Sequence, residues 1–178
     1  MAKAHIPFSF ALIALALLSA PSPAGESWVG RCDSVTDGDT ISVMRDGKPV
    51  KVHLYGIDCP ESGQPWSDQA RQLTGDLCYG QDVIVTLVDT DLYGRMVGLV
   101  SISSVHPGEA AFDVNAALVE AGMAWVYPQY CKIPECARWR ELETKAKAAR
   151  KGLWERDNPT PPWEWRRGRR MKDAGKAP

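Results

Sequence analysis

Four acidic residues lie at the two ends of one short stretch of the chain. Asp37 and Asp39 belong to an Asp-Gly-Asp-Thr sequence, and Asp58 and Glu61 belong to an Asp-Cys-Pro-Glu sequence. A Ca²⁺ ion is bound by several oxygen atoms of carboxylates, backbone carbonyls and waters, at roughly 2.3–2.6 Å. If the two ends meet in space, Asp39 and Asp58 can bind one hard cation together with the backbone carbonyl of Cys59. Glu61 follows a proline that stiffens the turn, and it could instead hold a water molecule beside the metal.

The residues between the two acidic ends predict a β-hairpin. Residues 41–44 and 50–55 alternate apolar and polar side chains, which is typical of half-buried strands. Residues 45–49 contain an Asp-Gly pair, which is typical of a tight turn between antiparallel strands. We therefore expect Asp39 and Asp58 to finish at the same end of the hairpin.

Each acidic sequence taken alone also has an ordinary interpretation. Asp-Gly-Asp-Thr is more often a turn stabilised by Asx hydrogen bonds than a metal site, and an Asp-x-Pro-Glu turn is equally unspecific. Here the two sequences are paired across a predicted hairpin and are followed by Asp-Leu-Tyr-Gly-Arg at residues 91–95. This combination is much harder to explain as a coincidence.

With these motifs the chain resembles the staphylococcal nuclease (thermonuclease) family over residues 28–155. The family pattern is Asp-Gly-Asp-Thr, then Arg-Leu-x-x-x-Asp-x-Pro-Glu, then Asp-x-Tyr-Gly-Arg, an Asn-x-x-Leu-Val helix and a late Trp. The chain has the first motif at residues 37–40, the third at 91–95, the helix motif at 115–119 and the tryptophan at Trp154. Motifs in this order favour the fold of the family.

The resemblance implies a set of metal-binding residues. Asp39 and Asp58 would be Ca²⁺ ligands, and the backbone carbonyl of Cys59 would be the third. Asp37 and Thr40 would be neighbours of the metal. The implied cofactor is therefore Ca²⁺.

The resemblance also implies catalytic roles and exposes one departure from the family. Glu61 would be the general base or would orient the attacking water, Arg95 would bind the phosphate, and Tyr93 is a further candidate for substrate binding. His53 stands where the second motif begins with arginine.

The histidine at this position predicts weakened catalysis. A guanidinium donates two hydrogen bonds to phosphate oxygens, whereas a histidine donates one and, at its ordinary pKa of about 6.5, is mostly neutral at pH 7. Losing one such donor costs about 10²–10³ in rate elsewhere. Lys51 on the same strand face could add charge, and a carboxylate neighbour would favour protonated His53. A surface histidine without a role is the open alternative.

The remaining segments predict an α+β fold. Further strands are expected at 28–35, 82–88 and 96–103, and helices at 66–79, 110–120 and 134–151. A helix inserted after the third strand fits a five-stranded, partly open β-barrel of the oligonucleotide-binding (OB) type with three helices. Tyr127, in a short extended piece, could stack on a base or sugar in the barrel groove, or could belong to the core.

The two ends of the chain differ in composition from the predicted domain at residues 25–157. Residues 1–24 combine a short basic start, an apolar run at 8–20 and small residues near Ala24, which predicts a signal peptide removed on export. An uncleaved anchor is the weaker alternative, because the apolar run is shorter than the ~20 residues of a membrane span. The tail at 158–178 holds six Lys or Arg and two Asp or Glu, which could bind phosphate or be a solvated, disordered end.

The five cysteines suggest disulfides in an oxidising compartment. Cys131 and Cys136 close a short loop and are the first predicted pair. Cys32 and Cys78 could form a second bridge or remain two buried thiols. Zinc is disfavoured because the chain has no Cys-x-x-Cys spacing.

The sequence therefore predicts an exported, periplasmic or secreted, Ca²⁺-dependent nuclease. The resemblance implies hydrolysis of DNA and RNA with little sequence preference, leaving 3′-phosphates, and a small barrel groove suits single or frayed strands. We expect a monomer without a required protein partner or a membrane contact in its mature form. The net charge of −1 argues against a tight, non-catalytic binder of duplex. An inactive nucleic-acid-binding module, because of His53, and a domain with a purely structural calcium are the alternatives.

Overall fold

The computed structural model describes residues 25–91, 94–103 and 110–174. The predicted signal peptide and Tyr93 lie outside these residues. Within the described ranges, no helix is both long enough and apolar enough to cross a bilayer.

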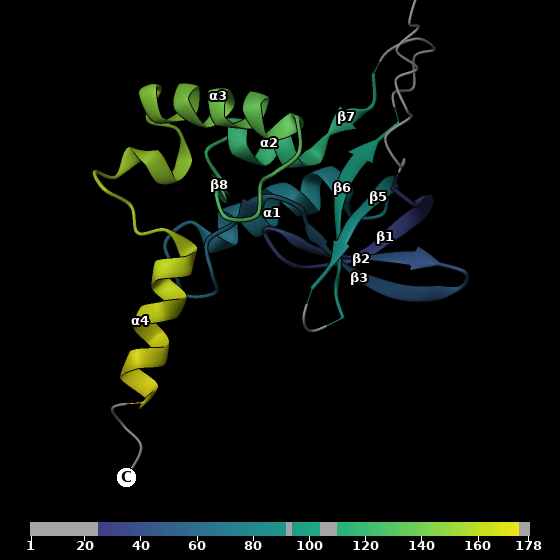
Figure 1. Ribbon diagram of the computed structural model, residues 1–178, viewed down its shortest axis with the longest axis horizontal. Helices are drawn as coiled ribbons and strands as arrows, with labels where there is room; N and C mark the ends of the chain where they lie inside the picture. The colour runs from purple at the N-terminus through teal and green to yellow at the C-terminus, as the bar shows by residue number, and fades with distance from the viewer. Residues whose placement is uncertain (1–24, 92–93, 104–109, 175–178) are drawn as a thin grey trace, which may run out of the picture.

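The centre of the molecule is a closed β-barrel (Figure 1). Its strands are β1 (Ser27–Asp37), β2 (Thr40–Arg45), β3 (Lys48–Leu54), β5 (Asp82–Thr90) and β6 (Met96–Ile102). Neighbouring strands are antiparallel in the order β3-β2-β1-β5-β6, and a parallel pairing of β3 with β6 closes the barrel. This confirms the predicted five-stranded barrel, to which the short strand β7 (Phe112–Asp113) adds an edge.

The predicted hairpin is formed by β2 and β3. Asp46 and Gly47 make its turn with positive φ angles of 50° and 76°, the conformation that a tight two-residue hairpin turn requires. At the other end Thr40 is paired with His53. The chain then continues into β4 (Ile57–Asp58), which pairs with β8 (Trp125–Val126). The register therefore brings the turn before β2 and the segment after β3 to the same end of the barrel.

The described residues form four α-helices, one more than predicted. They are α1 (Ser67–Cys78), α2 (Val114–Glu120), α3 (Glu135–Ala148) and α4 (Pro162–Ala174), with the 3₁₀ helix η1 (Gly152–Glu155) before α4. The start predicted for α2 at residue 110 is wrong, because residues 112–113 pair with β6 and the Asp113 side chain caps the helix by accepting from the Ala116 N–H at 2.9 Å. The C-terminal tail is helical over α4, so the interpretation as a disordered end is wrong for this part.

Apolar side chains of the strands fill the barrel, and α1, α2 and α3 cover it. Leu118 of α2 and Trp139 of α3 are fully buried in this core. The buried Asn115 explains part of the helix motif, because its side chain accepts from the Val100 N–H and donates to the Tyr55 carbonyl. These bonds fasten α2 to β6 and to the end of β3.

The cysteines divide into one disulfide and three thiols. Cys131 and Cys136 form the predicted bridge, with sulfur atoms 2.01 Å apart. Cys32 and Cys78 are buried free thiols, so the second bridge does not form. Burial raises the pKa of Cys78 to about 12, which keeps its thiol protonated at neutral pH.

Candidate active site

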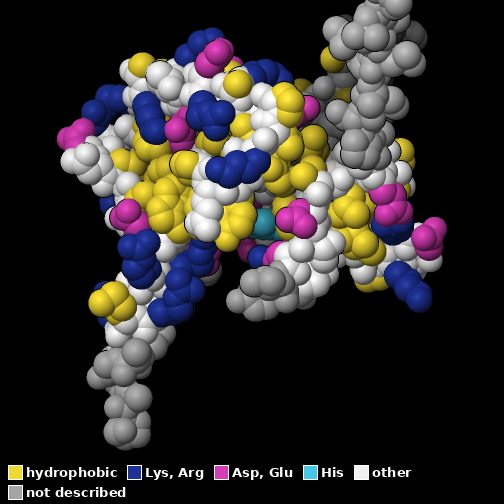
Figure 2. All heavy atoms as spheres, in the orientation of Figure 1, with side chains coloured by type: hydrophobic (Ala, Val, Ile, Leu, Met, Phe, Trp, Pro, Cys, Tyr) yellow, Lys and Arg dark blue, Asp and Glu magenta, His cyan; other side chains and the backbone are white. Residues whose placement is uncertain are grey.

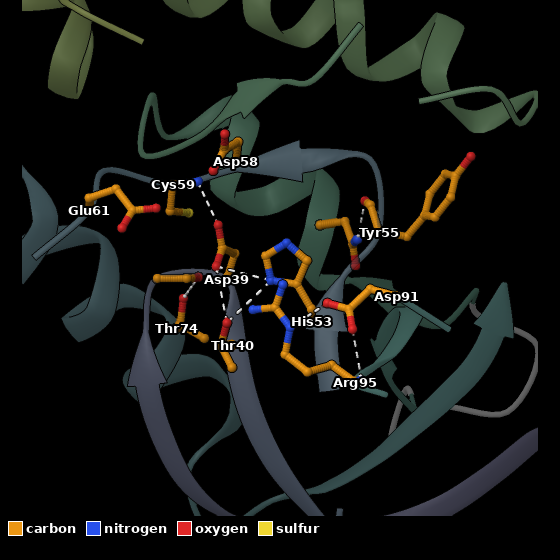
Figure 3. Close-up of polar contacts among 12 residues, drawn as sticks. Asp39, Thr40, His53, Tyr55, Asp58, Cys59, Glu61, Thr74, Asp91 and Arg95 are labelled. Carbon is orange, nitrogen blue, oxygen red and sulfur yellow. Dashed lines mark hydrogen bonds and ion pairs between the residues drawn. The ribbon is translucent and has the colours of Figure 1, made fainter. Parts of the chain in front are cut away.

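The structure brings the two acidic sequences together. Asp39 lies in the turn between β1 and β2 and is 6% exposed, and Asp58 lies in β4 and is 3% exposed. The Cys59 N–H donates to Asp39 Oδ2 at 2.7 Å, which joins the two segments directly (Figure 3). A Cβ atom on Gly38 would lie 2.7 Å from the Cβ of Cys59, so only glycine lets the turn approach this closely.

His53 is an ion-pair partner of Asp39. Its Nδ1 lies 3.3 Å from Asp39 Oδ1 and 3.2 Å from Thr40 Oγ1, and Figure 3 shows the three side chains facing one another. Burial by itself would lower the pKa of His53, but the charge of Asp39 and the hydrogen bond to it outweigh burial and raise that pKa. The neighbouring carboxylate therefore favours protonated His53, which the sequence allowed as an alternative to the neutral imidazole.

The other two aspartates of the site, Asp37 and Asp58, have raised pKa values. Burial raises the pKa of Asp37 to about 6, and the charge of Asp39 adds to this effect. Burial also raises the pKa of Asp58 to about 6, although hydrogen bonds from Arg166 oppose the rise. Asp37 Oδ1 is buried and has no hydrogen-bond partner among the described residues. Burial is thus the main reason why the ionised forms of Asp37 and Asp58 are disfavoured.

Arg166 of α4 reaches into this site. Its Nη1 and Nη2 donate to the two oxygens of Asp58 at 3.0 and 2.8 Å, and Nη1 also donates to Glu61 Oε1. Burial by itself would lower the pKa of Arg166, but the two carboxylates outweigh burial and hold that pKa above its usual range. Arg166 belongs to a basic run in the sequence, but the pattern by itself assigns this residue no role, because the contact joins residues 108 positions apart.

The oxygen atoms present suit a hard cation better than a soft one. Burial, with the charges of Asp39 and Asp58, raises the pKa of the Cys59 thiol well above its usual range, so its sulfur is protonated and unsuited to bind metal. Asp58 and Glu61 already converge on one positive group, the Arg166 guanidinium. In the ranges that the structure describes, no three acidic, histidine or cysteine side chains surround a single metal position. Metal binding would therefore use Asp39, Asp58 and backbone or water oxygens.

Arg95 lies at the edge of the same site. It follows the turn that begins with Asp91, and Asp91 accepts hydrogen bonds from the Arg95 N–H, at 2.9 Å, and from its guanidinium. Figure 3 shows the Arg95 side chain extending towards His53, and its positive charge opposes the protonation of His53. Arg95 is therefore close enough to act on a group bound beside the imidazole.

Two predicted substrate contacts lie in different surroundings. Tyr127 is stacked against Trp163 of α4, with ring centroids 4.7 Å apart and planes 11° apart, so this ring face is covered. Lys51 is exposed on β3, opposite Ser42. Both remain predictions.

The chain is similar to two proteins that are named as nucleases and to one named ParB. A sequence profile described as "Staphylococcal nuclease homologue" matches residues 51–156. A protein named micrococcal nuclease from Shigella flexneri is 40% identical over 159 residues, covering 88% of this chain and 91% of the relative. An uncharacterized endonuclease from Escherichia coli O157:H7 is 39% identical over 137 residues, covering 77% and 84%, respectively. A protein named ParB from Escherichia coli is 40% identical over 162 residues, covering 88% and 89%.

Proposed function

The chain belongs to the staphylococcal nuclease family, and on this premise we propose that it is a Ca²⁺-dependent nuclease that hydrolyses DNA and RNA with little sequence preference. Nuclease activity follows from the family itself, whereas the metal, the substrates and the products are our proposal. One observation carries it: two buried aspartates, Asp39 and Asp58, meet beside Glu61 at the mouth of a site bordered by cationic side chains.

Calcium would be held by Asp39, Asp58 and the Cys59 carbonyl, with Asp37 and Thr40 beside it. The burial of these carboxylates supports the assignment, since a divalent ion would stabilise their ionised form. When bound, the ion would polarise the phosphate and balance the charge that develops on it.

The side chains of the chain would handle the water and the phosphate. Glu61, with 34% of its side chain exposed, can orient a water molecule and accept its proton. The water oxygen would bond to phosphorus while the bond to the 5′ oxygen breaks, leaving a 3′-phosphate and a 5′-hydroxyl. Arg95 and protonated His53 would donate hydrogen bonds to the phosphate oxygens.

The substrate and the setting follow from the same reasoning. The surface of a small barrel of the OB type suits splayed nucleotides better than rigid duplex, so we propose a preference for single or frayed strands. We also propose that the protein acts as a monomer after export. These statements depend on the family and on the sequence of residues 1–24.

Removal of calcium is the direct test of this proposal. We expect the purified protein to cleave single-stranded DNA and RNA with Ca²⁺ and to stop when a chelator of Ca²⁺ is added, because the carboxylates then lack the charge that offsets them. Gel assays of cleavage and calorimetric titration with Ca²⁺ measure activity and binding separately. Calcium binding that raises the melting temperature without cleavage would favour a structural ion, and binding of nucleic acid without cleavage would favour a binding module.

Replacement of His53 by arginine tests the departure from the family. We expect His53→Arg to raise kcat/KM by about 10- to 100-fold, since one added charged hydrogen bond is worth about 1.5–3 kcal/mol. His53→Gln, which removes the charge, should lower kcat/KM. If His53→Arg lowers activity with unchanged Ca²⁺ affinity, the imidazole is adapted to its partner Asp39 and our account of this position is wrong.

A further inference from the structure

Arg166 forms the most extensive contact between the C-terminal helix and the acidic site. Two parallel hydrogen bonds join its guanidinium to Asp58, and a third joins it to Glu61. Its side chain is 33% exposed, so the group is partly desolvated. The family profile ends at residue 156, and the helix that carries Arg166 therefore lies beyond the matched region.

The start of α4 is fastened to the barrel by apolar and polar contacts. Trp163 stacks on Tyr127 and meets the edge of Trp125, with centroids 6.5 Å apart. Immediately before the helix, Gln64 Nε2 donates to the Thr160 carbonyl at 2.6 Å. Because these contacts lie shortly before Arg166 along the chain, folded structure positions its guanidinium. The rest of α4 runs away from the domain (Figure 1), and Lys and Arg side chains follow it (Figure 2).

A salt bridge for stability alone is a weak explanation of this contact. Burying a charge costs several kcal/mol, and an ion pair offsets that cost only when geometry and further hydrogen bonds are good. Asp58 is the proposed ligand of the metal, and Glu61 is the proposed acceptor of the water proton. The guanidinium of Arg166 is therefore a third cation, beside His53 and Arg95, at the position where a phosphate would have to bind. A planar guanidinium suits phosphate oxygens as well as it suits a carboxylate.

His53 offers a phosphate fewer hydrogen-bond donors than an arginine would, so a further cation has a role in the site. Its Nδ1 faces Asp39 and Thr40, which leaves the other ring nitrogen as the one N–H for a phosphate. Once a divalent ion offsets the charge of Asp58, the guanidinium of Arg166 can keep Glu61 and exchange Asp58 for a phosphate oxygen.

We propose that Arg166 is a further substrate-binding residue of the active site, which α4 supplies to the scissile phosphate and which provides the paired hydrogen-bond donors that His53 does not. The inference rests on the proposed nuclease function. The same contact has a rival explanation, in which Arg166 blocks Ca²⁺ binding and α4 inhibits the enzyme.

The test compares Arg166→Gln with Arg167→Gln, an exposed neighbour on the same helix. We expect Arg166→Gln to lower kcat by about 10²–10³, the effect of losing one donor to the developing charge. Arg167→Gln should stay close to wild type at moderate salt. Equal activity of the two variants, or higher activity in Arg166→Gln, would overturn the proposal.

Calcium affinity separates substrate binding from a structural role. Calorimetry should show that Arg166→Gln binds Ca²⁺ at least as tightly as wild type, because a cation that competes for Asp58 is gone. Weaker Ca²⁺ binding would overturn the proposal, since Arg166 would then order the carboxylates for the metal.

Two further variants keep the proposal testable if Arg166→Gln proves unstable. Arg166→Lys keeps the charge and should retain part of the activity. Added guanidinium ion should restore part of the activity of Arg166→Ala, and no such restoration would count against the proposal.

A comparison of His53→Arg in two backgrounds tests whether Arg166 compensates for the histidine at position 53. His53→Arg should raise kcat more in the Arg166→Gln background than in wild type, because the two guanidinium groups would serve the same charge. Equal gains in both backgrounds would overturn that link. Failure of the proposed function would appear differently, as wild-type protein without Ca²⁺-dependent cleavage.

Discussion

Glu61→Gln is expected to reduce the kcat for Ca²⁺-dependent cleavage by about 10²–10⁴, the usual contribution of a positioned general base. Glutamine keeps the size of the side chain and can still bind water, but it cannot accept the proton. The Glu61 N–H donates to Gln64 Oε1 at 3.0 Å, and the Gln64 N–H donates to the Glu61 carbonyl at 2.8 Å. Because these backbone bonds hold the turn, the substitution should leave its position unchanged.

Single-turnover cleavage of a labelled single strand measures this effect. Glu120→Gln, an exposed change at the end of α2, is the matched control and should behave as wild type. The Ca²⁺ affinity of Glu61→Gln should change little, since Glu61 is assigned to the water beside the metal. Cleavage by Glu61→Gln at the wild-type rate would show that another group activates the water. The same variant also excludes contaminating nucleases in the calcium experiment.

Arg95→Ala should lower kcat by about 10²–10³, an effect comparable to that of Glu61→Gln, because a donor to the developing charge on phosphate is lost. The hydrogen bonds that Arg95 donates to Asp91 hold its backbone and guanidinium in place. Arg95→Lys should recover part of the loss, since an ammonium keeps the charge without the planar pair of donors. Asp91→Asn should give a smaller loss through poorer positioning of Arg95.

The control for this experiment is Arg138→Ala on α3, whose partner Asp113 caps α2 outside the acidic site. Its activity should match wild type. A fall in melting temperature for Arg95→Ala without a fall in kcat would contradict the catalytic role and leave Arg95 a structural residue of the turn. A loss confined to KM would mean that Arg95 binds ground state and transition state equally.

The sequence by itself determined the barrel and the meeting of Asp39 with Asp58. Both depend on local patterns: alternation along β2 and β3 identifies their inward faces, and the Asp46-Gly47 turn fixes their register. The Cys131–Cys136 bridge was predictable for the same reason, since it closes a short loop. The start of α2 was not, because a short pairing with β6 competes with the helical pattern before Asp113.

Only the tertiary structure decided the electrostatics of the site. The charge on His53 depends on its distance from Asp39, and the state of Cys32 and Cys78 depends on how α1 packs on β1. The placement of Arg166 depends on Trp163 stacking against Tyr127, which directly follows β8, the partner strand of β4. No local period encodes such a contact, because it arises from the packing of segments that are adjacent in space and distant along the chain.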